Sequence, residues 1–330
     1  MKILVTGANG LLGHHVVMQL LSNHHDVNII VRSTVNIHFD LSKVNCVQGN
    51  FTDKETMIKA ISGCDAVIHI AAVTDMNICD YQTYHTVNVE ATKQLLEIAK
   101  EYHIKSFIYV SSANTIGYGN KRTLAAENLP FAYPFTKSHY AKSKFEAEKI
   151  VRNYAHFFHA IIINPTFMIG SYDTKPSSGQ LVLMAYKKPL LLIPSGGKNF
   201  VAVEDVATAC CNALTMGKSG ENYLAAYINL SFKDYFQLQK TIGNYRQCMI
   251  VLPDIFMKLI GYFGDLLVLL KIKVSFHSRN INQLLINEYY TYAKAKKELL
   301  MPETPVENAI QSALTWFEER KKINKLKIID

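Results

Sequence analysis

A glycine-rich turn between an apolar strand and an amphipathic helix is the feature that most constrains this chain. Residues 2–6 are β-branched and apolar, as in a buried strand, and residues 12–21 carry apolar side chains at helical spacing. Between them, Gly7 allows a tight turn, Gly10 lets the backbone approach a pyrophosphate, and Gly13 lets helix and strand pack closely. Free N–H groups at the helix start then face the phosphates. The pattern predicts a dinucleotide-binding corner; the alternative is that the glycines serve only as a tight connection.

Length and composition set the scale of the fold. The 330 residues, of which 49% are hydrophobic, suffice for one large α/β domain and a smaller one. No uncharged apolar run is long enough to span a membrane, and the N-terminus has no signal-peptide pattern. We therefore expect a cytoplasmic protein with no stable membrane span.

Cysteines and charge narrow the classes of partner. The six cysteines form no C-x-x-C pair and no cluster with histidine, which predicts free thiols and no metal site. The net charge of +8 is spread over scattered lysines, apart from the tail at 321–327. We interpret that tail as a solvated end and expect no nucleic-acid partner. A positive field favours anionic small molecules, and dinucleotides are anionic.

Further apolar runs alternate with helical patterns along the first half of the chain. This alternation of strand and helix is typical of a doubly wound parallel sheet. The expected strands are 27–31, 44–48, 65–72, 106–110 and 160–165, with helices that include 88–102 and one around Tyr140.

Arg32 follows the second expected strand, where the choice between nicotinamide cofactors is made. A carboxylate here would accept hydrogen bonds from the adenosine ribose, whereas a guanidinium can pair with a 2′-phosphate. Neither neighbour of Arg32 is acidic, and Ser33 gives weaker support. NADP(H) is therefore favoured, with NAD(H) still possible; the alternative is an arginine that merely ends an exposed strand.

Tyr140 and Lys144 are four residues apart and so share one face of the expected helix. A phenol is too weak an acid to donate a proton readily at neutral pH, and a nearby ammonium lowers its pKa. Tyr140 can then act as general acid or base at a carbonyl oxygen. Ser111 and Ser112 lie at the end of strand 106–110, and a serine hydroxyl there can hydrogen-bond the same oxygen.

The motifs together resemble one family. Thr6–Gly13 is similar to the T-G-x-x-G-x-x-G signature of extended short-chain dehydrogenase/reductases, the NAD-dependent epimerase/dehydratase family. Ser112–Gly117 resembles the S-A-T-V-Y-G segment of its sugar-nucleotide epimerases, in which the first serine is catalytic. The resemblance, nearest the dihydroflavonol-4-reductase-like branch, implies that Ser112, Tyr140 and Lys144 are catalytic and that Lys144 holds the nicotinamide ribose.

The same resemblance implies a set of cofactor contacts along the chain. Asn50 stands where the family has an acid that reads adenine, and this departure weakens that contact. Asn88 is expected to steady neighbouring active-site backbone, whereas His69 is interpreted as a core histidine rather than an acid/base residue. The full cofactor set is Gly7, Asn9, Gly10, Leu11, Leu12, Gly13, Arg32, Asn50, Phe51, Ala71, Ala72, Val73, Asn88, Val110, Tyr140, Lys144, Pro165 and Thr166.

The second half carries weaker motifs. We expect residues 1–170 to form a Rossmann-type nucleotide-binding domain, to which segments near 199–215 return, and 171–330 to form mainly a smaller α/β substrate-binding domain. The polar loop 173–179 is predicted to border the substrate cleft, Asp205 to cap a helix, and 309–317 to form a closing helix. The apolar segment 249–274 is interpreted as helices that cover a pocket or pack on the core, with membrane contact as the alternative.

Three functions are compatible with these residues. The first is NADP(H)-dependent reduction of a carbonyl, or oxidation of the alcohol, on a small and partly apolar substrate. The second is an NAD-dependent sugar-nucleotide epimerase or dehydratase, and the third is a cofactor-sensing protein without catalysis. The sequence does not reveal the substrate. A homodimer through the helices around 88–102 and 136–155 is compatible with the family but not required.

Overall fold

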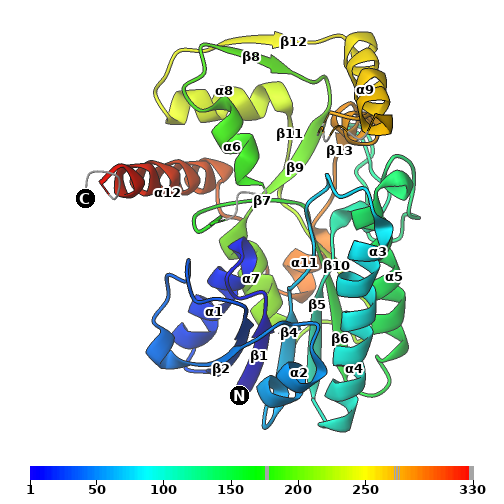
Figure 1. Ribbon diagram of the computed structural model, residues 1–330, viewed down its shortest axis with the longest axis vertical. Helices are drawn as coiled ribbons and strands as arrows, with labels where there is room; N and C mark the ends of the chain where they lie inside the picture. Colours follow the sequence, from blue (N-terminus) through cyan, green and yellow to red (C-terminus); the bar gives the residue numbers. More distant parts are fainter. Residues whose placement is uncertain (175–177, 271, 273, 275, 327–330) are drawn as a thin grey trace.

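The computed structural model describes residues 1–174, 178–270, 272, 274 and 276–326. A seven-stranded sheet forms the lower half of the molecule in Figure 1, and smaller sheets with helices form the upper half. Among these residues, no helix has the length and apolar character that crossing a membrane requires.

All seven strands of the main sheet run parallel, in the order β10-β6-β5-β4-β1-β2-β3. Their bounds are β1 Lys2–Thr6, β2 Asp26–Val31, β3 Val44–Gln48, β4 Ala66–His69, β5 Ser106–Val110, β6 His159–Pro165 and β10 Asn222–Ala225. The predicted doubly wound parallel sheet is therefore confirmed, although β4 is shorter than the expected 65–72. The chain winds outward in both directions from β1 and β4, so the two strands flank the switch point where ligands of such sheets bind.

Successive side chains of these buried strands point to opposite faces of the sheet, and each face has its own hydrophobic core. On one face, Val5 and Ile29 pack with α1 (Leu11–Ser22) and α7 (Val203–Asn212). On the other face, Leu4 packs with helices α2 (Lys54–Ile61), α4 (Ala91–Glu101) and α5 (His139–Asn153). Both faces of the sheet are thus covered by helices.

The expected helix 88–102 has a more specific shape. The chain passes from α3 (Tyr81–Tyr84) through a π-helical segment at His85–Glu90 and only then into α4. Asn88 lies in the π segment, a feature that is often found at functional sites.

The upper half contains a four-stranded sheet and a two-stranded one. The larger sheet consists of β7 (Phe167–Ile169), β9 (Gly197–Ala202), β11 (Ile228–Ser231) and β13 (Asn287–Glu288), and the smaller one pairs β8 (Leu190–Ile193) with β12 (Cys248–Val251). Its helices are α6 (Gly179–Ala185), α8 (Phe232–Ile242), α9 (Asp254–Leu269) and α10 (Ser278–Leu284), with α11 (Ala293–Glu298) below them beside β10. The domain boundary at residue 170 stays a prediction. The sequence analysis did not predict that β10, which lies beyond this boundary, forms the edge strand of the main sheet.

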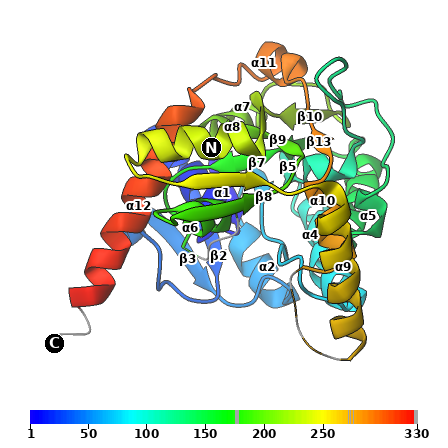
Figure 2. The ribbon, with the colours of Figure 1, turned by 90° about the horizontal axis from the view of Figure 1, so that it is seen from above.

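The closing helix is confirmed as part of α12 (Val306–Leu326), which packs on α6, α8 and β9 and projects sideways in Figures 1 and 2. The basic tail is helical up to Leu326, and residues 327–330 lie outside the described residues.

Asp205 does not cap a helix, contrary to the sequence expectation. Helix α7 begins at Val203, and Ala202 occupies the capping position without a side-chain bond. The Asp205 carboxylate instead accepts hydrogen bonds from the backbone N–H of Thr304 at 2.8 Å and from its hydroxyl at 2.7 Å. Its role is to tie the chain before α12 to α7.

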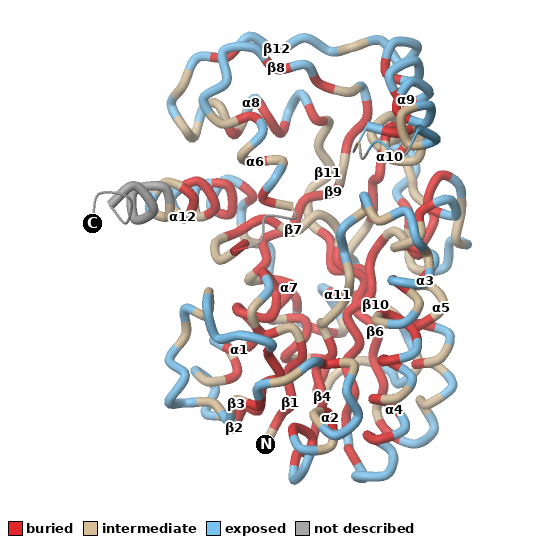
Figure 3. Tube along the Cα trace, in the orientation of Figure 1, coloured by how far each residue is buried: buried red, intermediate tan, exposed pale blue. Residues whose placement is uncertain are grey.

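Core packing explains only part of the apolar segment 249–274, and its predicted role as the cover of a pocket stays a prediction. Within α9 only Met257, Gly261 and Gly264 are buried, and most of its large apolar side chains are exposed. Figure 3 shows α9 largely in the colour of exposed residues. Packing on the core therefore accounts for only a narrow side of this helix.

Candidate active site

The glycine-rich turn joins β1 to α1 as predicted, and two of its glycines are required by packing. Gly7 has a φ of +74°, and a Cβ there would lie 2.8 Å from the backbone nitrogen of Ala71. A Cβ on Gly13 would lie only 2.1 Å from the carbonyl oxygen of Gly7. Gly10 differs, because the nearest atom to a Cβ added at this position would be the Gly7 carbonyl oxygen, at 3.4 Å. The protein's own packing therefore does not require a glycine at position 10, whereas a ligand that approaches this backbone would.

The N-terminus of α1 is free to bind an anion. Gly10 is its capping residue and makes no side-chain cap, and the first turn contains no acidic residue. The side chains of Leu11 and Leu12 are buried in the core below, so only their backbone can face a ligand. Exposed N–H groups and the helix dipole make this end suited to a phosphate group.

A pocket of about 440 Å³ lies beside this turn. It is lined by Asn9 of the turn, Arg32 and Ser33 after β2, Val35, Asn36 and Thr174. Among the described residues, the exposed Arg32 guanidinium has no carboxylate partner. A pocket of this kind, with a cation on its wall, suits an anionic or ribose-bearing ligand.

The loop 173–179, which is predicted to border the substrate cleft, begins beside the glycine-rich turn. The Thr174 hydroxyl donates to the carbonyl of Asn9 at 3.4 Å. The border of the cleft itself stays a prediction. Lys175, Pro176 and Ser177 lie outside the described residues. The beginning of the loop therefore contacts the glycine-rich turn, a contact that no local sequence pattern predicted.

Hydrogen bonds between Thr6 and the chain at His69–Ala71 connect the ends of β1 and β4 at the switch point. The Thr6 hydroxyl oxygen accepts hydrogen bonds from the N–H groups of Ile70 and Ala71, both at 3.1 Å, and lies 2.7 Å from His69 Nδ1. The other imidazole nitrogen lies 2.9 Å from the Thr92 hydroxyl. Burial holds the pKa of His69 well below its usual range, and Lys144 adds to that effect. The interpretation of His69 as a core residue is confirmed.

Asn88 fixes the backbone next to Ala71 and Ala72. Its amide exchanges two hydrogen bonds with the backbone of Val73, at 2.8 and 3.0 Å, and donates a third to the Ser143 hydroxyl at 2.9 Å. Ser143 in turn donates to the carbonyl of Tyr140. Asn88 thus connects the loop after β4 to the helix that carries Tyr140, which agrees with the steadying role expected for it.

The other predicted cofactor contacts differ in which of their atoms a ligand could reach. Asn50 is exposed, whereas the Phe51 ring is buried against His69 at 4.9 Å between centroids, so Phe51 can offer only its backbone. Pro165 is buried at the end of β6. The Thr166 hydroxyl donates to Asn199 Oδ1 at 2.8 Å, which ties this strand end to β9.

Ser112, Tyr140 and Lys144 come together at the carboxyl end of β5. Ser112 caps a short 3₁₀ turn (Ala113–Thr115) just beyond the strand, and Tyr140 and Lys144 lie on α5. Lys144 is 2% exposed and donates from Nζ to the carbonyl of Val110 at 2.6 Å. Its Nζ also lies 4.3 Å from the centre of the Tyr109 ring.

Burial dominates the ionisation of this group. It raises the pKa of Tyr140, and a hydrogen bond with the Ser112 side chain opposes that rise. Burial lowers the pKa of Lys144 to about 7, and the charge of Glu148 opposes that fall. The sequence argument expected the ammonium to lower the pKa of Tyr140. Among the described residues, it is instead the hydrogen bond with Ser112 that opposes the effect of burial on this pKa.

Glu148 is a residue that the sequence reasoning missed. Its carboxylate is 2% exposed and accepts hydrogen bonds from Thr115 Oγ1 at 2.6 Å and from Asn164 Nδ2 at 2.7 Å. Asn164 also donates to the carbonyl of Ser112 at 3.0 Å. The available signal was the spacing, because Glu148 follows Lys144 by one helical turn on the face that carries Tyr140.

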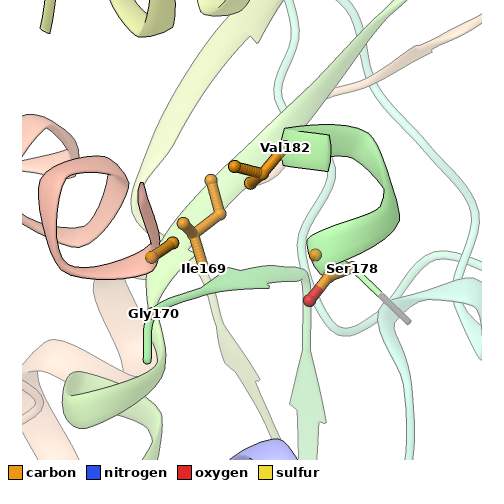
Figure 4. A pocket seen from close by; sticks show the side chains of 6 residues that line it. Ile169, Gly170, Ser178 and Val182 are labelled. Carbon is orange, nitrogen blue, oxygen red and sulfur yellow. The ribbon is translucent and has the colours of Figure 1, made fainter. Parts of the chain in front are cut away.

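A second hollow has no room for a ligand. It is a crevice between β7, α6 and α12, and it leaves no space for a water molecule. Figure 4 shows the side chains of Ile169 and Val182 facing this crevice. Among the described residues, no group of three or more histidine, cysteine, aspartate or glutamate side chains could hold a metal ion.

Comparison with known proteins agrees with this geometry. Residues 3–226 match the model of the NAD dependent epimerase/dehydratase family. The chain is 25% identical to the putative dihydroflavonol 4-reductase of Synechocystis sp. over 95% of this chain and 94% of that protein. It is 25% identical to sterol demethylase protein B of Methylococcus capsulatus over 98% of this chain and 100% of that one. The crystal structure of gox2253 superposes with a TM-score of 0.81 at 28% identity, over 97% of this chain and 98% of the other.

The chain therefore belongs to the NAD dependent epimerase/dehydratase family and is an NAD(P)-dependent oxidoreductase of the extended short-chain dehydrogenase/reductase type.

Proposed function

We propose that this member of the family reduces the carbonyl group of a small, partly apolar molecule with NADP(H), or oxidises the corresponding alcohol. The observation that carries the proposal is the meeting of Ser112, Tyr140 and Lys144 at the carboxyl end of β5, next to the switch point of the sheet. A hydroxyl, a phenol and an amine in this arrangement match the needs of proton transfer to a carbonyl oxygen.

The residues present fit a dinucleotide. Gly10 leaves the backbone open where the packing does not require glycine, and the N-terminus of α1 has no capping side chain. The neighbouring pocket of about 440 Å³ has room for the adenosine end of a cofactor. Bound there, the cofactor supplies or accepts the hydride. The exposed Arg32 supports NADP(H), because its guanidinium can pair with a 2′-phosphate.

Tyr140 supplies the proton in the proposed reduction. Its raised pKa keeps the phenol protonated at neutral pH, and it donates its proton to the carbonyl oxygen as hydride reaches the carbon. Ser112 donates a hydrogen bond to the same oxygen and stabilises the charge that develops on it. Lys144 holds the nicotinamide ribose and, in its charged form, stabilises the Tyr140 phenolate until a proton from solvent replaces the one transferred.

The names of two relatives support an apolar substrate class. Dihydroflavonol 4-reductase and sterol demethylase protein B are both named for ring compounds with apolar bodies. We therefore infer a cyclic ketone or alcohol with an apolar body as the substrate class for this chain.

The test combines nucleotide binding with turnover. Purified protein is titrated with NADP⁺ and NAD⁺, and oxidation of NADPH is followed with a panel of cyclic ketones. We expect tighter binding of NADP⁺, turnover of an apolar ketone, and a Tyr140→Phe variant that binds nucleotide like wild type but does not turn over. Retained turnover in Tyr140→Phe would refute the role of Tyr140. Tightly held NAD⁺ with interconversion of a nucleotide sugar would replace the proposal with an epimerase.

A further inference from the structure

Exposed apolar side chains gather on neighbouring elements at one end of the molecule. They lie on the outward side of α9 and on one face of the β8–β12 pair. These elements lie together at the top of Figure 1 and face the viewer in Figure 2. We call this surface the distal apolar face; its members are Leu190, Leu192, Ile250, Ile255, Phe256, Leu259, Ile260, Tyr262, Phe263, Leu266, Leu269 and Leu270, each more than 40% exposed.

Close packing on one side fixes which way α9 presents its apolar residues. A Cβ on Gly264 would lie 2.4 Å from the carbonyl oxygen of Phe276, and one on Gly261 would lie 3.0 Å from Ser278 Cα. Met257 is buried on the same side. At about 100° per residue, the exposed apolar side chains cover roughly half of the helix circumference opposite this contact. The outward apolar arc is therefore a defined feature of the fold.

The β8–β12 pair adds a second set of exposed apolar side chains next to α9. Leu190 pairs with Cys248 and Leu192 with Ile250, so these four side chains share one face of the two-stranded sheet, and all are exposed. The opposite face carries buried side chains of β8 in the core of the upper half. Val251 then leads directly into α9 through Leu252 and Pro253.

The acidic side chains of α9 and the basic side chains around the distal apolar face differ in their bonding partners. Both carboxylates of α9 are held by local bonds, since Asp254 accepts from the Ser195 hydroxyl at 2.5 Å and Asp265 from the Ser278 N–H at 3.0 Å. Three basic residues flank the face: Lys188 before β8, Arg246 before β12 and Lys258 on α9, all exposed. Within the described part of the chain, none of the three has a carboxylate partner.

We propose that the distal apolar face binds the surface of an anionic lipid bilayer, with α9 lying in the interface. Apolar side chains that enter the acyl boundary, next to basic residues that meet anionic headgroups, are the recognised composition of interfacial helices. A two-fold pair of this chain is less well matched. In such a pair the same surface meets itself, so the basic residues of one copy would be brought toward those of the other. The inference does not depend on the proposed substrate.

The test is flotation of the full chain with lipid vesicles. Vesicles of phosphatidylcholine and phosphatidylglycerol in equal parts are compared with vesicles of phosphatidylcholine alone. We expect wild type to float with the anionic vesicles, and the double variant Phe256→Ser/Phe263→Ser to lose about tenfold or more in partition. Leu124→Ser/Leu300→Ser is the matched control, because it removes two exposed apolar side chains elsewhere and should float like wild type.

Charge reversal and oligomeric state complete the test. Arg246→Glu/Lys258→Glu should weaken flotation with anionic vesicles and leave any binding to phosphatidylcholine unchanged. Circular dichroism and a cooperative urea transition show that each variant is folded. Failure of folded wild type to float, or equal flotation of wild type and Phe256→Ser/Phe263→Ser, would overturn the proposal. A dimer in sedimentation velocity that this variant dissociates, without flotation of wild type, would assign the face to a second copy.

Discussion

The carboxylate of Glu148 accepts a hydrogen bond from the side chain of Asn164 at 2.7 Å, between α5 and the end of β6. Both residues are buried, and Asn164 also donates to the carbonyl of Ser112. One buried charge therefore contacts the strand end that positions Ser112 and lies one helical turn from Lys144. A buried carboxylate in such a network is costly unless it is fully hydrogen-bonded.

Replacing Glu148 with glutamine should shift the pH dependence of turnover. The charge of Glu148 raises the pKa of Lys144, which burial has lowered to about 7. Its removal lowers that pKa further, so the charged form of Lys144 is lost at lower pH as pH rises. We expect the alkaline limb of kcat to move to lower pH by about one unit.

The control for this change is Glu146→Gln on the same helix. Glu146 pairs with Lys142 at 3.9 Å and is not among the groups that shift the pKa of Lys144. Its pH profile should match that of wild type. If Glu148→Gln lowers thermal stability but keeps the wild-type pH profile, Glu148 has only a structural role.

Gly10 and Gly13 should respond differently to alanine. A Cβ at Gly13 would lie 2.1 Å from the Gly7 carbonyl, so Gly13→Ala should prevent or severely disturb folding. A Cβ at Gly10 fits at 3.4 Å, so Gly10→Ala should change the free energy of unfolding by less than about 1 kcal/mol. It should nevertheless weaken dinucleotide binding by about tenfold or more, because the methyl group occupies the space of the pyrophosphate. Urea denaturation and NADP⁺ titration measure the two effects; unchanged affinity in Gly10→Ala would place the phosphates elsewhere.

Arg32→Ala should change the choice of cofactor without affecting the fold. The exposed guanidinium lines the pocket beside Asn9 and has no carboxylate partner in the described chain. Loss of its pairing with a 2′-phosphate should weaken NADP⁺ binding by about ten- to a hundredfold. NAD⁺ affinity in the same variant is the internal control and should stay constant. An equal loss for both nucleotides would assign Arg32 to general electrostatic attraction.

The sequence predicted best what depends on local pattern. The turn at Gly7, the strand before it and the pairing of Tyr140 with Lys144 all follow from short-range periodicity, and the structure has the strand and helices there. Glu148 was missed because helical spacing alone does not say that β6 will bury it. The contact of Thr174 with Asn9 was not predicted because it joins residues far apart in sequence. The exposure of α9 was missed for the same reason, since its apolar composition is equally compatible with a core helix.

His14 should make the fold sensitive to acid. It is 1% exposed in α1, and its ring stacks on Tyr172 at 4.1 Å between centroids. Burial, together with the smaller effects of the charges of His15 and His38, lowers the pKa of His14 to about 3. The unfolded chain binds this proton near the ordinary pKa of 6.5, so stability is fully present above that value and is lost as pH falls toward 3.

This single group should lower the free energy of unfolding by about 3 kcal/mol between neutral pH and about pH 4. His14→Phe keeps a ring against Tyr172 and removes the titrating group, so its stability should fall less steeply with acid. Urea denaturation at several pH values, followed by circular dichroism, measures both slopes. The matched control is His103→Phe, because His103 is exposed at the end of α4 and its replacement should leave the wild-type slope unchanged. Parallel slopes for wild type and His14→Phe would show that other groups govern acid unfolding, of which His15, beside Glu204 at 3.8 Å, is the nearest.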